Sequence, residues 1–462
     1  MSPSVDMKLL TLTSRRAATA VAIGKESFFP NFHLPRWSKW IGRLKGKSTF
    51  DGSFHQAVAP VLFVGQCFTL MPVVEIFSHN PRNTRFKLLS VRFAYTAIYL
   101  IAAGFYSILA CRRFILRGLN VSSFADMFYL MFNYIITVLF LLIAIQWQKV
   151  LKEFANCERL MLKDAYTKLT ERVTRFNLAW RIRMVIAGII VLAFFEDFLN
   201  FYSAYQDNYV QMDYCNRTEI SFWENFYIRD HPQVFQYVPV NIGSILFVEW
   251  INRCLRYTWT YLDLFIISFS YAAQFRYTQI YQRLVSVEGT HYPTTFWREI
   301  RTDYVAVSQL VAFLDEQFGH LILLSCANDM YFIATQLFNG FQNGTLLCRR
   351  RPAFMTMVYF WYSLALLIFR TLCMLYIGSG VHVASMSPLN ILRNVPSKYW
   401  GLDLQRLTDD VASGENTLSG KKFFYLKRQI ILAMAGTLVT YELVLMDQVK
   451  QAPDPTTDCS FY

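Results

Sequence analysis

The sequence predicts an all-α membrane protein with seven transmembrane helices, a cytosolic amino terminus and an extracellular carboxyl terminus. Of its 462 residues, 54% are hydrophobic and 17% are aromatic, which is typical of chains that cross a membrane several times. Seven apolar stretches are long enough to cross a bilayer as helices. The net charge of +13 comes from basic residues between these stretches rather than in one patch. Membrane topology therefore explains the charge better than nucleic-acid binding does.

Two segments precede the first predicted span. Residues 1–56 are largely polar and basic and begin without the compact apolar core of a signal peptide, so we expect a cytosolic amino-terminal tail. Residues 57–88 start with an apolar run that Pro60, Gly65 and Pro72 interrupt. We interpret this run as an interfacial or re-entrant segment, followed by a linker.

Six spans are predicted within residues 89–377, which we expect to form a ligand-binding bundle with cytosolic helix extensions. These spans are Leu89–Ala110, Phe124–Trp147, Met184–Ser203, Tyr237–Ala272, His320–Asn339 and Met355–Ile377. The fourth continues without a helix breaker to Val285, and Thr294–Gln317, before the fifth, also has helical periodicity. A single helix over the fourth run would measure about 70 Å, more than a bilayer is thick. The extensions therefore predict a second helical bundle on the cytosolic side.

The rest of the chain is divided at the last apolar stretch. Residues 378–422 are assigned to a cytosolic anchor region, residues 423–449 to the final membrane helix and residues 450–462 to an extracellular tail. Within the anchor region, Leu389–Lys422 has helical periodicity. The final helix begins after two basic residues and is apolar over about the eighteen residues that a crossing requires.

One face of this final helix combines small, apolar and acidic side chains. Thr440, Val444, Asp447 and Gln448 share that face at helical spacing. A pore-lining helix presents such a face when several copies meet around an axis. The alternative is a single anchoring helix whose acidic groups reach the interface.

Two features favour the predicted orientation. The segments placed on the inside contain 32 of the 45 lysines and arginines. The three N-glycosylation sequons, at Asn120, Asn216 and Asn343, all fall in segments placed outside. This orientation is opposite to that of a G-protein-coupled receptor.

The motif Thr440–Met446, with the sequence TYELVLM, resembles the terminal signature of insect gustatory receptors, which is Thr-Tyr, five mostly apolar residues and Gln-Phe. Its Thr-Tyr-Glu-Leu form is similar to that of the sugar-receptor branch, and Met71-Pro72 before the first span also resembles this family. The chain differs from the signature at Asp447, where the family usually has glutamine, and at Gln448, where it has phenylalanine. The layout of the whole chain resembles the family, whereas the motif covers only the last helix.

The resemblance implies a sugar-gated, non-selective cation channel that acts as a taste receptor in the plasma membrane of sensory neurons. The family is similar in fold to insect odorant receptors, which are tetramers around a pore lined by the seventh helix. A homotetramer or a mixed tetramer with related receptors, surrounded by membrane lipid, is implied. Each subunit would hold a mono- or disaccharide in an outward-facing pocket. A secondary transporter and a metabotropic seven-helix receptor are the alternatives.

An enzyme is not expected, and neither is a cofactor, a metal ion or a nucleic-acid partner. The seven histidines are scattered and none has the spacing of a metal-ligand pair. The sequence also contains no nucleophile elbow and no phosphate-binding loop.

For the pore, four copies of Asp447 would form an acidic ring near the outer mouth, which favours cations. Val444, one turn further in, is a candidate hydrophobic constriction, and Thr440 lies deeper on the same stripe. Glu442 points away from the stripe and is expected to pair with a neighbouring span or subunit.

A sugar pocket needs flat apolar faces and convergent hydrogen-bonding groups, and ionisable groups inside a membrane are functional candidates. The outer halves of the predicted spans supply Tyr99, Tyr106, Asn133, Tyr134, Glu196, Asp197, Asn200, Asn241, Glu249, Trp250, Asp329, Gln336, Trp361 and Tyr362. As the alternative, Glu249 or Glu196 neutralises Arg253 or Arg370 inside the bundle. The fifth span, running from Asp329 towards the final helix, is expected to couple pocket and pore.

Overall fold

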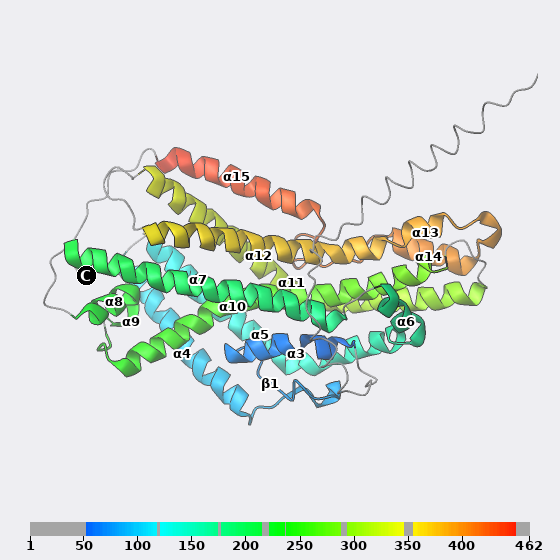
Figure 1. Ribbon diagram of the computed structural model, residues 1–462, viewed down its shortest axis with the longest axis horizontal. Helices are drawn as coiled ribbons and strands as arrows, with labels where there is room; N and C mark the ends of the chain where they lie inside the picture. The colour runs from blue at the N-terminus through cyan, green and yellow to red at the C-terminus, as the bar shows by residue number, and fades with distance from the viewer. Residues whose placement is uncertain are drawn as a thin grey trace, which may run out of the picture. The chain divides into compact units, whose positions relative to one another are not determined.

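The computed structural model describes residues 52–117, 121–173, 177–214, 221–235, 237–287, 293–345 and 354–449, and it confirms a mostly helical chain. Long helices run side by side in Figure 1. Five helices of the described part are long and apolar enough to cross a membrane. The corresponding candidate spans are Val91–Leu116, Met127–Met161, Leu178–Asp213, Thr295–Phe338 and Phe354–Arg393, the last of which runs past the end of its long helix at Met386.

The first described helix is short. Helix α3 (Phe54–Cys67) has 14 residues and contains Pro60. At 1.5 Å per residue it measures about 21 Å, less than the hydrocarbon core of a bilayer. Most of its apolar residues are buried, and it packs against helices α7 and α10, whereas Phe63 is exposed. Two-residue strands β1 (Val73–Val74) and β2 (Arg85–Phe86) then pair antiparallel, and the 3₁₀ turn η2 (Pro81–Asn83) lies between them.

The next helices form the first half of the bundle. Helix α4 (Val91–Arg117) packs against α5 (Val121–Met161). The short α6 (Asp164–Val173) precedes α7 (Leu178–Tyr214). Two short helices, α8 (Phe222–Asp230) and α9 (Pro232–Phe235), lead into α10.

Helix α10 (Ile242–Val285) is the central element of the fold. It is continuous over 44 residues, about 66 Å, as its uninterrupted sequence predicts. It contacts α3, α5, α7, α11 and α12, and most of its residues from Tyr257 to Ala273 are buried. Where a helix is enclosed by others, as α10 is over its middle, it can carry charged groups that pair internally. Those charges explain why α10 is not among the five strongly apolar helices.

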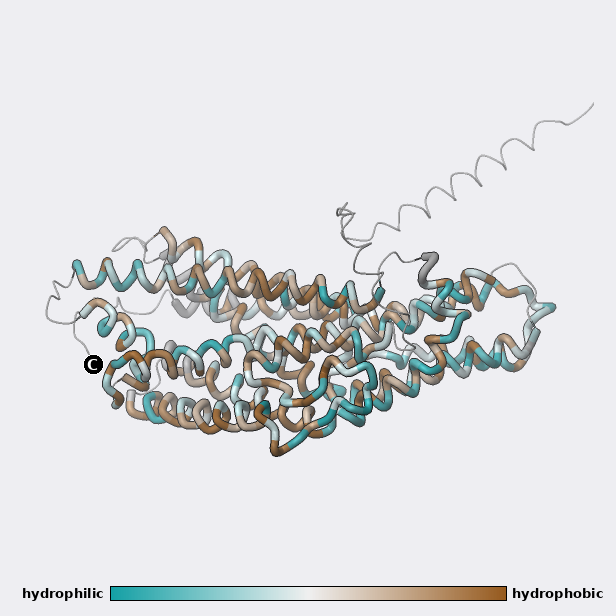
Figure 2. Tube along the Cα trace, turned by 60° about the horizontal axis from the view of Figure 1, so that its bottom comes forward, coloured by the Kyte–Doolittle hydropathy of each residue, from teal (hydrophilic) through white to brown (hydrophobic). Residues whose placement is uncertain are grey.

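The second half of the bundle contains two more long helices. Helix α11 (Thr294–Thr345) joins the predicted extension and the predicted fifth span into one helix of 52 residues, about 78 Å long. Helix α12 (Phe354–Met386) packs against α7 and α10. Figure 2 shows hydrophobic residues over the middle of the bundle and more hydrophilic residues towards the end where α11 begins.

Salt bridges hold this hydrophilic end together. Arg283 lies 3.0 Å from Glu299 and 3.5 Å from Asp303, whose carboxylate also accepts a hydrogen bond of 2.6 Å from Tyr166. Burial and the Asp303 charge raise the pKa of the Tyr166 hydroxyl. Arg301 pairs with Asp410 at 2.8 Å, which attaches α14 to α11. These charged contacts are the kind expected of helices that project beyond a membrane.

The approach to the last helix is less helical than its periodicity predicts. Within Leu389–Lys422 the structure has α13 (Leu389–Arg393), the 3₁₀ turn η3 (Ser397–Tyr399) and α14 (Leu402–Ala412), followed by non-helical chain. Helix α15 (Gln429–Val449) begins six residues later than the predicted helix 423–449.

The cause is a tight turn between α14 and α15. Lys421 and Lys422 have φ angles of +51° and +64°, which a helix cannot contain, and Ser419 pairs with Tyr425 across the turn. The Asp315 side chain of α11 accepts hydrogen bonds from the Ser419 backbone N–H and, at 2.9 Å, from its hydroxyl. The backbone comes so close that a Cβ at Gly319 would lie 3.2 Å from the Ser419 carbonyl oxygen. Helix α11 therefore holds the segment that leads into α15.

Candidate ligand site and pore helix

A cluster of polar side chains lies between α7, α10 and α12, centred on Arg256. The Arg256 guanidinium donates to Asp197 Oδ1 at 2.7 Å, and Arg253 lies 3.0 Å from the other oxygen of that carboxylate. With its amide oriented to satisfy both partners, Asn200 accepts from Arg256 at 3.0 Å and donates to the Tyr359 hydroxyl at 3.1 Å. Asp197 is thus committed to holding two arginines.

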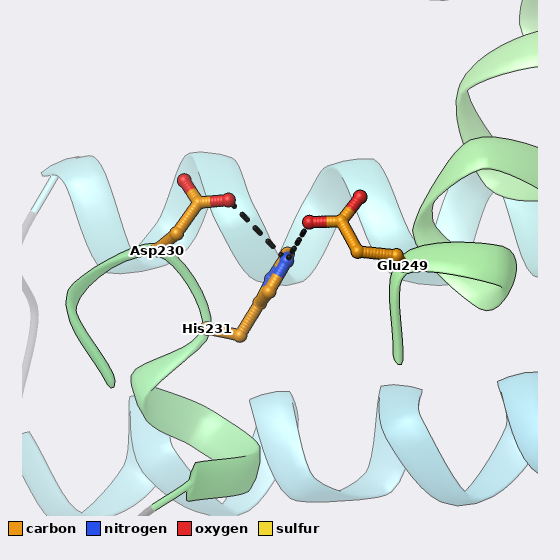
Figure 3. A group of neighbouring side chains, drawn as sticks. All are labelled: Asp230, His231 and Glu249. Carbon is orange, nitrogen blue, oxygen red and sulfur yellow. Dashed lines mark ion pairs between the residues drawn. The ribbon is translucent and has the colours of Figure 1, made fainter. Parts of the chain in front are cut away.

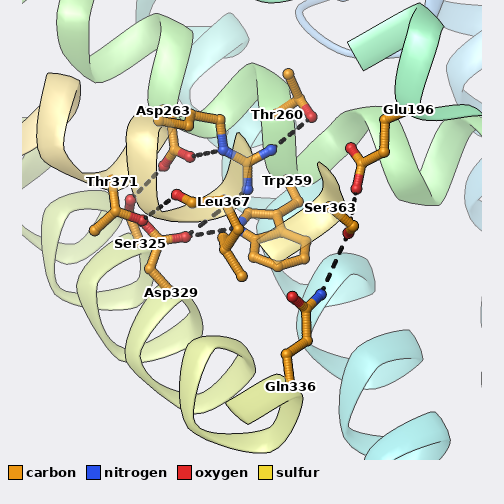
Figure 4. Close-up of polar contacts among 11 residues, drawn as sticks. Glu196, Trp259, Thr260, Asp263, Ser325, Asp329, Gln336, Ser363, Leu367 and Thr371 are labelled. Atoms are coloured by element: carbon orange, nitrogen blue, oxygen red, sulfur yellow. Dashed lines mark hydrogen bonds and ion pairs between the residues drawn. The ribbon is translucent and has the colours of Figure 1, made fainter. Parts of the chain in front are cut away.

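A second chain of hydrogen bonds, drawn in Figure 4, links Glu196 on α7, Ser363 on α12 and Gln336 on α11. The Ser363 hydroxyl donates to Glu196 Oε1 at 2.5 Å and accepts from Gln336 Nε2 at 3.4 Å. The Gln336 Oε1 atom is buried and accepts no hydrogen bond from the residues that the structure describes. Because residues four apart share a helix face, Glu196 on α7 faces the same partner helix as Asn200. One small region therefore gathers carboxylate, amide, hydroxyl and guanidinium groups.

A fully buried ion cluster joins α10, α11 and α12 beside this region (Figure 4). Arg370 Nε lies 2.6 Å from Asp263, and Arg370 Nη2 lies 3.9 Å from Asp329. The Trp259 indole donates to Asp329 at 2.7 Å, and its ring centre is 4.5 Å from the guanidinium. Thr371 also donates to Asp329, at 2.9 Å. The predicted ligand residue Asp329 is thus enclosed in protein contacts that stabilise the bundle.

Other predicted ligand residues gather between α4 and α10. Trp250 and Tyr99 form an edge-to-face pair with ring centres 5.8 Å apart, and the Trp250 indole donates to Tyr95 at 3.0 Å. Glu249 lies 3.4 Å from Arg253, so the charge neutralisation that the sequence left open occurs at this pair. Arg370, by contrast, pairs with Asp263 and Asp329 rather than with either glutamate.

The remaining predicted residues lie apart from both groups. Asn241 caps the start of α10, where its side chain accepts from the Ser244 N–H at 2.9 Å. Trp361 is 62% exposed on α12, and the neighbouring Tyr362 donates to the Leu192 carbonyl at 3.0 Å. Asn133 donates to the carbonyl of Tyr129 within its own helix.

Two predicted tyrosines remain: the Tyr106 hydroxyl lies 3.1 Å from His231 Nδ1, and Tyr134 packs over α4. A Cβ built at Gly104 would lie 3.3 Å from the Tyr134 hydroxyl oxygen, so the missing side chain of that glycine lets the ring approach. The structure therefore places Tyr134 in a helix contact between α4 and α5.

Sequence reasoning missed several residues of the Arg256 cluster. Arg256 itself, Tyr359 and Ser363 come from polar positions within predicted spans, and Trp259 lies one turn from Arg256 on α10. The four-residue spacing of Tyr359 and Ser363 on one helix face was an available signal. That spacing indicates a polar site only once the facing helix, α7, is known to carry Glu196.

A group able to hold a metal ion lies at the start of α10. Asp230, His231 and Glu249 bring one ligand atom each to within 4.8 Å of one another (Figure 3). The sequence predicts no metal ligands, because such a prediction considers only residues spaced closely along the chain. Here the turn between α8 and α9 brings Asp230 and His231 next to Glu249 of α10.

A cavity of about 250 Å³ lies elsewhere, between α5 and α11. Its lining is mostly apolar and contains none of the predicted ligand residues. The lining residues are Leu139, Leu142, Ile143, Gln146, Val150, Gln317, Phe318 and His320. Its chemistry does not match that of a sugar.

Helix α15 contacts α11 and α12 and leaves most of its surface uncovered in the single chain. Leu432, Val439 and Val444 are 77%, 61% and 56% exposed, and Thr440 is exposed as well. The helix contains Asp447 and Gln448, whose side chains lie outside the described part of the structure, as does that of Glu442. Such exposure of apolar groups is expected where further copies of the chain or lipid pack.

The side chains of the three predicted glycosylation sites lie outside the described part of the structure. Asn120 and Asn216 lie outside the described residues, and Asn343 lies near the end of α11 with its side chain outside the description. All three remain predictions.

Comparisons with known proteins agree on one group. Residues 41–459 match the family described as trehalose receptor. The chain is 32% identical over 396 residues to the gustatory receptor for sugar taste 64a of Drosophila melanogaster, covering 85% of this chain and 84% of that protein. It is 30% identical over 410 residues to gustatory receptor 5a for trehalose from the same species, covering 89% and 88%.

The fold is similar to that of a solved receptor. The insect olfactory receptor OR5 from Machilis hrabei, in complex with eugenol, superposes with a TM-score of 0.58. The match covers 84% of this chain and 97% of that one at 11% sequence identity, so it concerns the fold alone.

Proposed function

The chain belongs to the trehalose receptor family of gustatory receptors, and from this premise we propose that it is a sugar-gated, non-selective cation channel acting as a taste receptor. Membership of a receptor family agrees with the expectation that the chain is not an enzyme. Several apolar helices make it a multi-pass membrane protein. Its proposed location is the plasma membrane of sensory neurons. The observation that carries the proposal is the match to sugar-taste receptors over most of the chain.

The proposed sugar site is the Arg256 cluster together with the Glu196–Ser363–Gln336 chain. Its carboxylate, amide, hydroxyl and guanidinium groups include both donors and acceptors, which sugar hydroxyls require. The unused Gln336 Oε1 is an acceptor available to a hydroxyl. Trp259, one turn from Arg256, borders the site, where its indole donates to Asp329 and its ring lies against Arg370 and Phe332. Asp197 acts here by positioning Arg253 and Arg256 rather than by contacting the sugar.

The proposed topology contains seven spans with the amino terminus inside. The five strongly apolar helices supply five, and α10 and α15 supply the other two. Charge pairs at buried positions make α10 acceptable inside a membrane. The domain limits proposed from the sequence are kept in this topology except that the final helix begins at Gln429, and the hydrophilic end of the bundle lies in the cytosol.

The proposed pore forms where α15 helices of four subunits meet. The exposed apolar surface of α15 supports an arrangement in which other copies cover it. In this arrangement Asp447 forms an acidic ring, Val444 the constriction and Thr440 the deeper lining.

Helix α11 is the proposed coupling element between pocket and pore. It carries Gln336 in the proposed site and, further along, Asp315 and Gly319, which hold the turn before α15. It also contacts α15 directly. Sugar opens the channel in this scheme because it binds the open arrangement of α11 more tightly than the closed one.

The test is electrical recording from heterologous cells that express this chain alone, during application of a panel of mono- and disaccharides. The proposal predicts a sugar-evoked cation current that G-protein inhibition leaves unchanged. Uptake of labelled sugar without current would instead indicate a transporter, and a current abolished by G-protein inhibition would indicate a metabotropic receptor. Cells carrying the empty vector are the control.

A further inference from the structure

We propose that Asp230, His231 and Glu249 form a zinc-binding site, separate from the Arg256 cluster and the Glu196–Ser363–Gln336 chain proposed for sugar binding and from the pore helix. Glu249, predicted from the sequence as a sugar ligand, is therefore reassigned to the ion. Helix α8 ends at Asp230, and His231 follows it in the turn before α9. Glu249 lies in the second turn of α10. Figure 3 shows the imidazole edge of His231 directed between the two carboxylates.

Two of the three distances between the ligand atoms match those around a zinc ion. His231 Nε2 lies 3.3 Å from Asp230 Oδ2 and 3.5 Å from Glu249 Oε1. A tetrahedral zinc ion with bonds of about 2.0–2.2 Å holds its ligand atoms about 3.3–3.6 Å apart. The two separations from the histidine nitrogen therefore fit without movement of the backbone. All three ligand atoms lie within 4.8 Å of one another.

The contact of His231 Nδ1 with Tyr106 favours the tautomer whose Nε2 lone pair can bind a metal ion. The His231 side chain is 4% exposed, and its Nδ1 lies 3.1 Å from the Tyr106 hydroxyl. Gln233 donates to the same hydroxyl oxygen at 2.7 Å, and that oxygen has two acceptor positions. An Nδ1–H that donates to Tyr106 leaves Nε2 unprotonated, as metal-binding histidines require. Among the described residues, Nε2 has no hydrogen-bond partner although it is buried.

The donor set favours zinc over calcium or magnesium. An imidazole nitrogen is a ligand for zinc and its neighbours in the transition series, whereas calcium and magnesium take oxygen ligands. Two carboxylates balance the charge of a divalent ion. Arg253 occupies the other oxygen of Glu249, Oε2, at 3.4 Å, so Oε1 stays available. Three protein ligands leave a fourth position for water.

The position of the site indicates what the ion would do. It would tie the turn between α8 and α9 to α10, the helix that carries Arg253 and Arg256. The Asp230 side chain is 44% exposed, which gives the ion access from solvent. Bound zinc is therefore expected to stabilise this end of the bundle, since an ion that binds only the folded chain raises its stability.

The experiment uses the full-length chain, purified in detergent and freed of metal with a chelator. Zinc chloride is titrated against a competing fluorescent indicator, and thermal unfolding is followed with and without zinc. Glu249→Gln and His231→Gln are expected to lose one bound zinc per chain relative to the unchanged protein, together with the zinc-dependent rise in unfolding temperature. Tyr106→Phe is expected to weaken zinc binding by about 10- to 100-fold.

His79→Ala is the matched control, because His79 is exposed and belongs to a different segment. It should bind zinc as the unchanged protein does. Size-exclusion profiles in the absence of zinc establish that each variant is folded. The proposal is overturned if Glu249→Gln retains the full zinc stoichiometry and affinity. Equal stabilisation by the same concentration of calcium, undiminished in His231→Gln, would overturn the assignment to zinc.

Discussion

Replacing Arg370 with methionine should severely destabilise the chain, because the ion cluster that joins α10, α11 and α12 would lose its only cation among the described residues. Asp263 and Asp329 are both 0% exposed and both lie within 4.0 Å of the guanidinium. The variant leaves these carboxylates buried without a counter-charge. It also removes the hydrogen bond of 2.8 Å to Thr260 and the contact with the Trp259 ring.

The magnitude follows from the burial of the cluster. Breaking a buried ion pair by removing one partner destabilises a protein by about 3–5 kcal/mol, since the remaining charge is left unpaired. That difference changes the ratio of folded to unfolded chains by a factor of roughly 10² to several times 10³. Adding Asp263→Asn to the Arg370→Met variant removes one of the two unpaired carboxylate charges. The double variant should therefore regain part of the lost stability.

The assay is thermal unfolding of detergent-purified chains, read as the fraction that stays monodisperse after heating. Arg298→Met is the matched control, because Arg298 pairs with Asp403 at 3.3 Å while its side chain is 72% exposed. An exposed pair contributes roughly 0–1 kcal/mol, so this variant should unfold close to the unchanged protein. The reasoning fails if Arg370→Met unfolds at the same temperature as Arg298→Met, or if Asp263→Asn worsens the Arg370→Met variant.

Three further predictions concern sugar responses in cells, each with surface expression measured alongside. Arg256→Met should shift the sugar dose–response curve to higher concentration by at least about tenfold, because a charge-assisted hydrogen bond contributes about 1.5–3 kcal/mol; an unchanged curve would remove Arg256 from the site. Trp361→Ala should leave that curve unchanged, since the side chain is 62% exposed away from the cluster, and a large shift would restore it as a ligand residue. Asp315→Asn should lower the maximal current while binding of labelled sugar is retained, because the carboxylate accepts two hydrogen bonds from Ser419 in the turn before α15. An unchanged maximal current would show that this contact between α11 and the turn does not couple sugar binding to opening.

The continuous helices show what hydrophobic pattern alone can predict. The run from Ile242 to Val285 contains no proline, and the structure makes it one helix; the predicted span starts earlier, at Tyr237, but Pro239 lies outside the helix. The turn at Lys421 and Lys422 was not predictable in the same way. Neither residue is a glycine. Their positive φ angles accompany the hydrogen bonds by which Asp315 of α11 fixes the neighbouring Ser419. Tertiary contact overrides local helical preference there.

The candidate site shows where sequence reasoning ends. Intramembrane charge identified Glu196, Asp197 and Asp329 as residues of interest, and all three have polar partners inside the bundle. Their separate roles depend on which groups face them. Asp329 faces Arg370 in a closed cluster, whereas Glu196 faces a hydroxyl with an unused acceptor nearby. Such pairings come from helix packing and have no signature along the chain.

Charge reversal at Asp447 tests the central claim most directly, because that claim makes α15 the wall of a sugar-opened cation pore. Cells expressing Asp447→Lys and cells expressing the unchanged chain would be recorded in saturating sugar, with the reversal potential measured across a sodium chloride gradient. The account predicts that the lysine variant has a smaller current and a reversal potential shifted towards that of chloride. Identical currents and reversal potentials for the two proteins would contradict it.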